Sequence, residues 1–100
     1  NLNLPDQYHN GGIWPFVGGF YVAVLVKAGR LNEARQQLAK LAEVNRLGVN
    51  EEWEFNEWCH GRTGRPMGYP HQAWSAGMYV YAHRCVAKGQ VPVFGDEMWR

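Results

Sequence analysis

IWPFVGGFYVAVLVKA, residues 13–28, is the stretch that decides the fold. Its apolar side chains cover nearly every face of a helix, Pro15 suits a first helical turn, and Gly29 follows where a C-terminal cap belongs. We therefore predict a helix that is buried on all sides. Gly18 and Gly19 weaken such a helix by about 1 kcal/mol each relative to alanine, so we expect close packing there or a later helix start.

Periodic apolar residues predict two further helices. Asn32 can cap a second, amphipathic helix that ends near Gly48. The short connection requires the first two helices to form an antiparallel hairpin, with one helix inside and the other outside. A third helix is predicted from His71 to Lys88, with Gly89 after it as a cap. Its predicted inner stripe is Ala73, Trp74, Gly77, Met78, Tyr81, Ala82 and Cys85.

The remaining segments lack helical periodicity. Residues 1–12 are predicted to form a loop, residues 49–70 a structured but mostly irregular segment, and residues 90–100 a packed extension. The predicted fold class is all-α, built from antiparallel helical hairpins. One outer helix is too few to cover two apolar inner helices, because monomers rarely expose large apolar patches. We therefore expect more chain, or a second copy, to cover the core.

Composition and charge exclude several classes of function. One hundred residues are enough for one domain and too few for a multi-domain enzyme. With 46% hydrophobic residues and a net charge of +1, the chain is globular and lacks the basic surface of a nucleic-acid or anionic-lipid binder. The most apolar stretch, residues 13–26, is interrupted by Pro and Gly and falls short of the roughly 20 residues that cross a bilayer. We expect neither a nucleic acid nor a membrane as partner.

The cysteines bear on compartment and cofactors. Cys59 and Cys85 have no paired spacing, which favours free thiols in a reducing compartment and predicts a cytoplasmic protein. No Cys-x-x-Cys or His-x-x-x-His pair occurs, so no metal or other cofactor is predicted. Cys59 and His60 could form a nucleophile and base, but adjacent side chains rarely point together. The start at Asn1, without Met or a signal peptide, leads us to expect a longer parent polypeptide.

Polar and aromatic residues gather in two clusters, each just before a predicted helix. The first is YHNGGIWP, residues 8–15, and the second is EFNEWCHG, residues 54–61, which leads to QAWS at residues 72–75. Aromatic rings stack on the apolar face of a sugar, whereas amides, imidazoles and carboxylates bind its hydroxyls. The predicted ligand is therefore a carbohydrate. The candidate binding residues are Tyr8, His9, Asn10, Trp14, Trp58, His60, Gln72 and Trp74.

Glu57 is the candidate for acid or base catalysis. A carboxylate flanked by Phe55 and Trp58 is expected to lose solvation, which favours its neutral form. Glu54 is the competing carboxylate. The residues alone leave a structural alternative open, in which both acids face solvent or cap a helix. In the same alternative, the large aromatic residues of the two clusters serve only as core packing.

Three blocks of this sequence resemble one family. They are YHNGGIWP at residues 8–15, WEFNEW at 53–58 and QAWSAG at 72–77. Their order and spacing are similar to the C-terminal part of the alkaline/neutral invertase family, glycoside hydrolase family 100. Bacterial relatives labelled glycogen-debranching or amylo-α-1,6-glucosidase proteins are similar too. The resemblance implies an (α/α)6 barrel, of which residues 1–100 would be a C-terminal segment with no second domain.

The resemblance also implies an inverting glycoside hydrolase, whose acid and base carboxyls lie roughly 6.5–9.5 Å apart. In wider relatives such as trehalases the base is a Glu before aromatic and Asp residues, and Glu57 matches it. This chain departs from that pattern, since Trp58, Cys59 and His60 stand where those relatives have Tyr-Tyr-Asp or Lys-Tyr-Asp. The general acid would be an Asp far upstream, outside these residues.

Two hypotheses of function follow. In the first, the chain is part of a glycosidase whose leading substrate is sucrose, with an α-glucan or another α-glucoside second. The isolated chain would then be inactive, and its partners would be the sugar and the remainder of the parent chain or a second copy. In the second, the chain is a noncatalytic helical module for carbohydrate binding or assembly.

Overall fold

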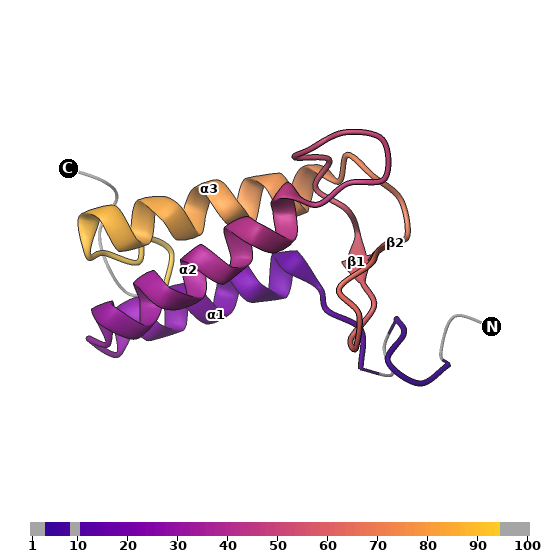
Figure 1. The fold of residues 1–100 in the computed structure, drawn as a ribbon. Helices are drawn as coiled ribbons and strands as arrows, with labels where there is room; N and C mark the ends of the chain where they lie inside the picture. The colour runs from indigo at the N-terminus through magenta and orange to yellow at the C-terminus, as the bar shows by residue number, and fades with distance from the viewer. Residues whose placement is uncertain (1–3, 9–10, 95–100) are drawn as a thin grey trace.

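The structure is a computed structural model that describes residues 4–8 and 11–94 (Figure 1). Within them the chain forms a layer of helices with a small two-stranded sheet at one end. The elements are α1 (Pro15–Lys27), α2 (Leu31–Arg46), β1 (Trp58–Cys59), β2 (Pro66–Met67) and α3 (Ala73–Lys88). The prediction of a helical fold is therefore confirmed, but the all-α prediction missed the sheet. His9 and Asn10, two predicted sugar-binding residues, lie outside the described residues.

The predicted hairpin of the first two helices is confirmed. Pro15 occupies the start of α1, where its missing N–H leaves no hydrogen bond unmade. At the other end Gly29, with φ of +77°, donates its N–H to Val26 O at 3.0 Å, and the Arg30 N–H is donated to Leu25 O at 2.9 Å. These two bonds form a Schellman motif, which satisfies the last carbonyls of α1 and reverses the chain into α2.

The start of α2 differs from the prediction. The N-cap position is Arg30, and no side chain caps the helix. Asn32 lies inside the first turn, where its Oδ1 accepts a hydrogen bond from Arg35 Nη1 at 3.1 Å. The prediction that Asn32 caps α2 is therefore wrong. The Asn32 side chain bonds to Arg35 in place of the backbone N–H groups of the first turn.

Close packing explains the paired glycines of α1. A Cβ at Gly19 would lie 2.9 Å from both the Cβ and the carbonyl O of Met78 on α3. A Cβ at Gly18 would lie 3.0 Å from Leu41 Cδ1 on α2. The two glycines therefore let α1 approach both of its neighbours, as their position inside an apolar helix predicted. The buried core between the helices consists of Val22, Ala23, Leu25, Val26, Ala34, Leu41, Ala82, Cys85 and Val91.

The prediction that α1 is buried on all sides is wrong for this chain. Val17 is 53% exposed, Tyr21 49% and Val24 61%. The described residues give α1 two helical neighbours, α2 and α3 (Figure 1). Two neighbours cannot enclose a whole helix, so one apolar face of α1 remains at the surface.

The third helix starts two residues later than predicted. His71 has a φ of +59°, which is left-handed and incompatible with a helix start there. Gly89 ends the helix with a φ of +64°, as predicted. Ala82 and Cys85 are buried as expected, but Trp74, in the predicted inner stripe, is 52% exposed. Beyond the helix Val91 and Pro92 are buried, so the described part of the predicted extension does pack.

The sheet lies in the segment predicted to be irregular. Strand β1 pairs antiparallel with β2, placing Trp58 opposite Met67 and Cys59 opposite Pro66. On its other side Cys59 exchanges two backbone hydrogen bonds with Ile13, at 2.7 and 2.8 Å. The hairpin is thereby tied to the segment that leads into α1. None of the helices in the described part of the chain combines the length and hydropathy needed to span a membrane.

Candidate functional site

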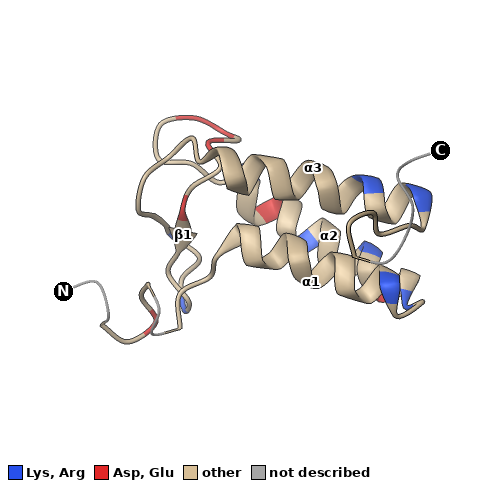
Figure 2. Cartoon of the chain, turned by 180° about the vertical axis from the view of Figure 1, so that it is seen from behind, with Lys and Arg blue, Asp and Glu red and all other residues tan. Residues whose placement is uncertain are grey.

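The clusters singled out in the sequence meet at one end of the helical layer. Helices α1 and α3 run in the same direction, so the segments that precede them lie at the same end, beside β1 (Figure 1). The loop after α2 reaches this end as well. Acidic residues occur in that loop and next to β1, whereas Lys27 and Lys88 lie in the last turns of α1 and α3 at the far end (Figure 2).

Three of the predicted sugar-binding residues form one aromatic cluster. The ring of Tyr8 lies edge-on to Trp14 at a centroid distance of 4.8 Å and to Trp58 at 5.9 Å. Trp14 Nε1 donates a hydrogen bond to the backbone O of Tyr8 at 2.9 Å. Trp58 is only 2% exposed, whereas Tyr8 and Trp14 are half-buried. Trp58 therefore serves mainly as packing, while the other two rings retain surface for a ligand.

The two candidate carboxylates differ sharply in their surroundings. Glu54 is 1% exposed, and its Oε1 accepts the backbone N–H groups of Glu51 and Asn50, both at 2.7 Å. The hydrogen bonds from Glu51 and Asn50, together with the nearby His71, hold the pKa of Glu54 below its ordinary value. Glu54 therefore closes the loop after α2. The structural alternative supposed that Glu54 faces solvent or caps a helix, and it does neither.

Glu57 is half-buried, and one of its two carboxylate oxygens is held in place. Its backbone N–H is donated to Tyr69 O at 2.9 Å, and its Oε1 accepts the Tyr69 N–H at 3.3 Å. Within the described residues Oε2 makes no hydrogen bond. One oxygen is thus oriented by the backbone and the other is available to a water molecule or a ligand.

The other predicted site residues lie around this carboxylate's hairpin and the start of α3. His60 Nδ1 accepts the N–H groups of Arg62 and Thr63 at 3.2 and 3.4 Å, so the imidazole braces the turn between β1 and β2. Gln72 occupies the N-cap position of α3, and Trp74, in the first turn, packs its ring 6.3 Å from that of Phe16.

Sequence reasoning missed two buried polar residues, Asn56 and Ser75, that fix the segment before β1. Asn56 is 3% exposed, and its Nδ2 donates to Leu47 O at 3.0 Å. Its own backbone O accepts a hydrogen bond from the Ser75 hydroxyl at 3.3 Å. No periodicity in the sequence could have revealed this role, because Phe55 adopts a left-handed φ of +51° and the segment is not a regular strand. Glu54 and Asn56 alternate on the buried side, which leaves Glu57 on the other.

The described residues show neither a reactive cysteine nor a cluster of metal ligands. Cys59 and Cys85 are both buried and lie outside any disulfide. Burial raises the pKa of the Cys59 thiol to about 11, so it carries almost no thiolate at neutral pH. Among residues 4–8 and 11–94 no group of three or more His, Cys, Asp or Glu side chains could hold a metal ion.

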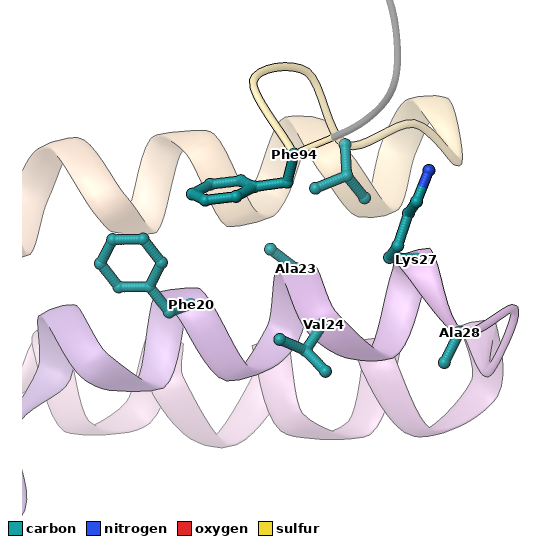
Figure 3. A pocket seen from close by; sticks show the side chains of 7 residues that line it. Phe20, Ala23, Val24, Lys27, Ala28 and Phe94 are labelled. Atoms are coloured by element: carbon teal, nitrogen blue, oxygen red, sulfur yellow. The ribbon is translucent and has the colours of Figure 1, made fainter.

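Some hollows of the surface have an almost wholly apolar lining, and others are lined by both apolar and polar side chains. An apolar hollow of about 320 Å³ lies at the far end, where Phe20 and Phe94 point toward one another (Figure 3). Apart from Lys27 it offers no polar side chain, so it lacks the donors and acceptors that a sugar needs. A smaller hollow of about 150 Å³ includes Trp14 and Tyr21 with Gln37 and Lys40 of α2. It adjoins the aromatic cluster.

Comparison with known proteins decides the family. The family model described as alkaline and neutral invertase matches residues 1–89. The chain belongs to the alkaline and neutral invertase family. It is also 30% identical, over 84 residues, to alkaline/neutral invertase C, mitochondrial, of Arabidopsis thaliana. That match covers 84% of this chain and 12% of the relative, so the chain spans about an eighth of the relative's length. No solved structure matches the chain.

Family membership confirms the invertase part of the resemblance predicted from the three blocks. The matched residues 1–89 include the aromatic cluster, both candidate carboxylates and the start of α3. Glu57 and its surroundings therefore lie in the part of the chain that identifies the invertase family.

Proposed function

We propose that this chain is the base-bearing part of an inverting glycoside hydrolase that cleaves sucrose or a related α-glucoside, with Glu57 as general base. The observation that carries the proposal is the state of the two carboxylates. Glu54 is enclosed, with Oε1 bonded to its loop and Oε2 buried without a hydrogen-bond partner among the described residues, whereas Glu57 is half-buried, with Oε1 oriented by Tyr69 and Oε2 available. Membership of the invertase family supports the reaction class.

In an inverting hydrolase the base takes a proton from water while that water attacks the anomeric carbon. The hydrogen bond from the Tyr69 N–H to Oε1 would fix the carboxylate so that Oε2 faces the water. A general acid supplied from outside these residues would protonate the leaving oxygen. Tyr8 and Trp14 would stack on the sugar rings, and His60, Gln72 and Trp74 would line the site around them.

The exposed face of α1 supports a proposal for the rest of the molecule. Val17, Tyr21 and Val24 would be covered by further helices of a longer chain, closing an (α/α)6 barrel of which residues 1–100 are a C-terminal segment. We place that protein in a reducing compartment, the cytoplasm, because Cys59 and Cys85 of this chain form no disulfide. The isolated 100-residue chain should instead self-associate through this face. A compact monomer in sedimentation experiments would contradict the barrel proposal.

Substitution of Glu57 tests the proposed base. In the full-length protein Glu57→Gln should lower kcat for sucrose about 10²–10⁴-fold, with KM and thermal stability little changed. NMR of the sugar newly released by the unmodified protein should show the anomeric configuration opposite to that of the cleaved bond. Glu52→Gln is the matched control, since Glu52 is an exposed acid of the neighbouring loop. Full turnover by Glu57→Gln would contradict the assignment, and sucrose binding without hydrolysis by the unmodified protein would favour a noncatalytic module.

A further inference from the structure

Gly68 lies against the carboxylate of Glu57. It follows β2 directly and has a left-handed φ of +70°. A Cβ at this position would lie 2.6 Å from Glu57 Oε1, 2.7 Å from Trp58 Cδ1 and 2.8 Å from Trp58 Nε1. Real Cβ atoms essentially never come within 3.0 Å of other heavy atoms. The position therefore excludes a side chain through its contacts as well as through its backbone conformation.

A second glycine of the same hairpin separates these two causes. Gly64 has an almost identical φ of +74°, but nothing lies within 4 Å of where its Cβ would be. A side chain at either position is strained by the left-handed backbone, by about 1 kcal/mol. Only at Gly68 does it also meet Glu57 and Trp58.

We propose that Gly68 is a positioning residue for Glu57, an inference that rests on the proposed role of Glu57 as base. The missing side chain lets the carboxylate lie directly against the backbone of residue 68. There Oε1 is within reach of the next N–H in the chain, that of Tyr69, at 3.3 Å. The Glu57 N–H is donated to Tyr69 O at 2.9 Å, which fixes the backbone from which the Glu57 side chain extends.

A methyl group at residue 68 would displace the Glu57 carboxylate more readily than the Trp58 indole. Trp58 is 2% exposed and packed against Tyr8, so its indole resists displacement. Glu57 is half-buried, and its carboxylate is the far end of a flexible side chain. The contact with Oε1 is therefore relieved by rotation of the Glu57 carboxylate away from the Tyr69 N–H, whereas the contacts with the Trp58 indole remain and lower stability. A shift of about 1 Å in a catalytic group can lower turnover by about 10²-fold.

The test compares two glycine substitutions in the full-length protein. Gly68→Ala should lower kcat for sucrose about 10–100-fold, with a smaller change in KM. Gly64→Ala shares the backbone strain and should lower thermal stability while leaving kcat near that of the unmodified protein. Combined with Glu57→Gln, Gly68→Ala should cause no further loss of kcat, because the group it displaces is already inactive. A merely structural role for Gly68 would instead add its own loss.

Each outcome decides the matter. Equal kcat values for Gly68→Ala and Gly64→Ala would overturn the inference, as would a full additional loss in the Glu57→Gln background. Should Gly68→Ala fail to fold, the same comparison is made in a Trp58→Leu background, where a smaller and more flexible side chain replaces the indole ring beside residue 68. Failure of the proposed function shows itself separately, as unchanged turnover by Glu57→Gln alone.

Discussion

The two ends of the helical layer are held together by different means. At the far end the chain leaves α1 and α3 through Gly29 and Gly89, which adopt left-handed backbone freely. At the site end three residues around Glu54 adopt it without being glycine. Their φ values are +60° for Trp53, +51° for Phe55 and +59° for His71. At the far end Val93, with a φ of +79°, is also left-handed without being glycine.

Strained residues of this kind cost about 1–3 kcal/mol each and persist only where the surroundings hold them firmly. At the site end the surroundings are buried polar groups. The Glu54 carboxylate binds the preceding loop, its backbone O accepts the His71 N–H at 2.6 Å, and Phe55 O accepts the Gln72 N–H at 2.9 Å. At the far end a side-chain hydrogen bond, from the Tyr81 hydroxyl to Pro92 O, lies beside Val93, and apolar contacts such as Phe20 with Phe94 fill the space around it. The contrast teaches that polar bonds at the site end maintain the strained segment that delivers Glu57.

The sharpest way to break this contrast is to remove the charge of Glu54. In the full-length protein Glu54→Gln should cause the largest fall in melting temperature of the substitutions considered below, because a neutral amide replaces a buried carboxylate that accepts two backbone N–H groups. Its melting temperature is measured beside that of Glu52→Gln, an exposed acid whose ion pair with Arg46 contributes little.

The loss should depend on pH in a definite direction. Hydrogen bonds from Glu51 and Asn50 lower the pKa of Glu54 in the folded state, so the ionised group stabilises the fold above the ordinary value of 4.5. That stabilisation declines as the pH falls below 4.5 and is gone below the folded-state pKa. The difference between the unmodified protein and Glu54→Gln should therefore shrink on acidification. A difference that stayed constant would show that the charge of Glu54 is not what holds the loop.

Two glycine substitutions in the helices should change stability by an intermediate amount. Gly19→Ala should lower the free energy of unfolding by about 1–3 kcal/mol, because its methyl group meets the backbone of Met78. Gly77→Ala should raise it by about 0.5–1 kcal/mol, since nothing lies within 4 Å of that position on α3. Denaturant unfolding measures both. Stabilisation by Gly19→Ala would show that α1 and α3 are not in close contact there.

The helices could be predicted from the sequence because their signals are local. Apolar periodicity, Pro15 at a helix start and glycines after helix ends indicated the helices, with errors of one or two residues at their boundaries. The exposure of Val24 could not be predicted, because periodicity does not report how many neighbours a helix has. Nor could the sheet, whose strands of two residues show no period.

The site shows the same division between local and long-range information. The sequence indicated Glu57 through its aromatic neighbours and the family resemblance, whereas the different surroundings of Glu57 and Glu54 emerge only from the fold. Tyr69 and Gly68, which contact Glu57, lie more than ten positions along the chain and carry no chemical signal of their own in the sequence. Long-range backbone contacts of this kind depend on the hairpin between β1 and β2, which the sequence did not reveal.

The smallest expected effect concerns Cys59, the thiol nearest the site. Its backbone is paired with Ile13, and burial raises the pKa of its thiol to about 11, so only about 10⁻⁴ of it is ionised at pH 7. Iodoacetamide should therefore leave Cys59 unmodified in the folded full-length protein, and Cys59→Ala should retain turnover. Mass spectrometry of the Cys59 peptide measures the labelling, with guanidinium-unfolded protein as the positive control.

Cys85 is the matched residue of the helical core, where it is equally buried between the helices. If the site end is as tightly closed as the core, both thiols should resist the reagent to the same degree. Selective labelling of Cys59 together with loss of turnover would show that the site end opens in solution, and it would restore Cys59 and His60 as a candidate nucleophile and base. Equal resistance would leave Glu57 as the group at this end whose position suits it to react.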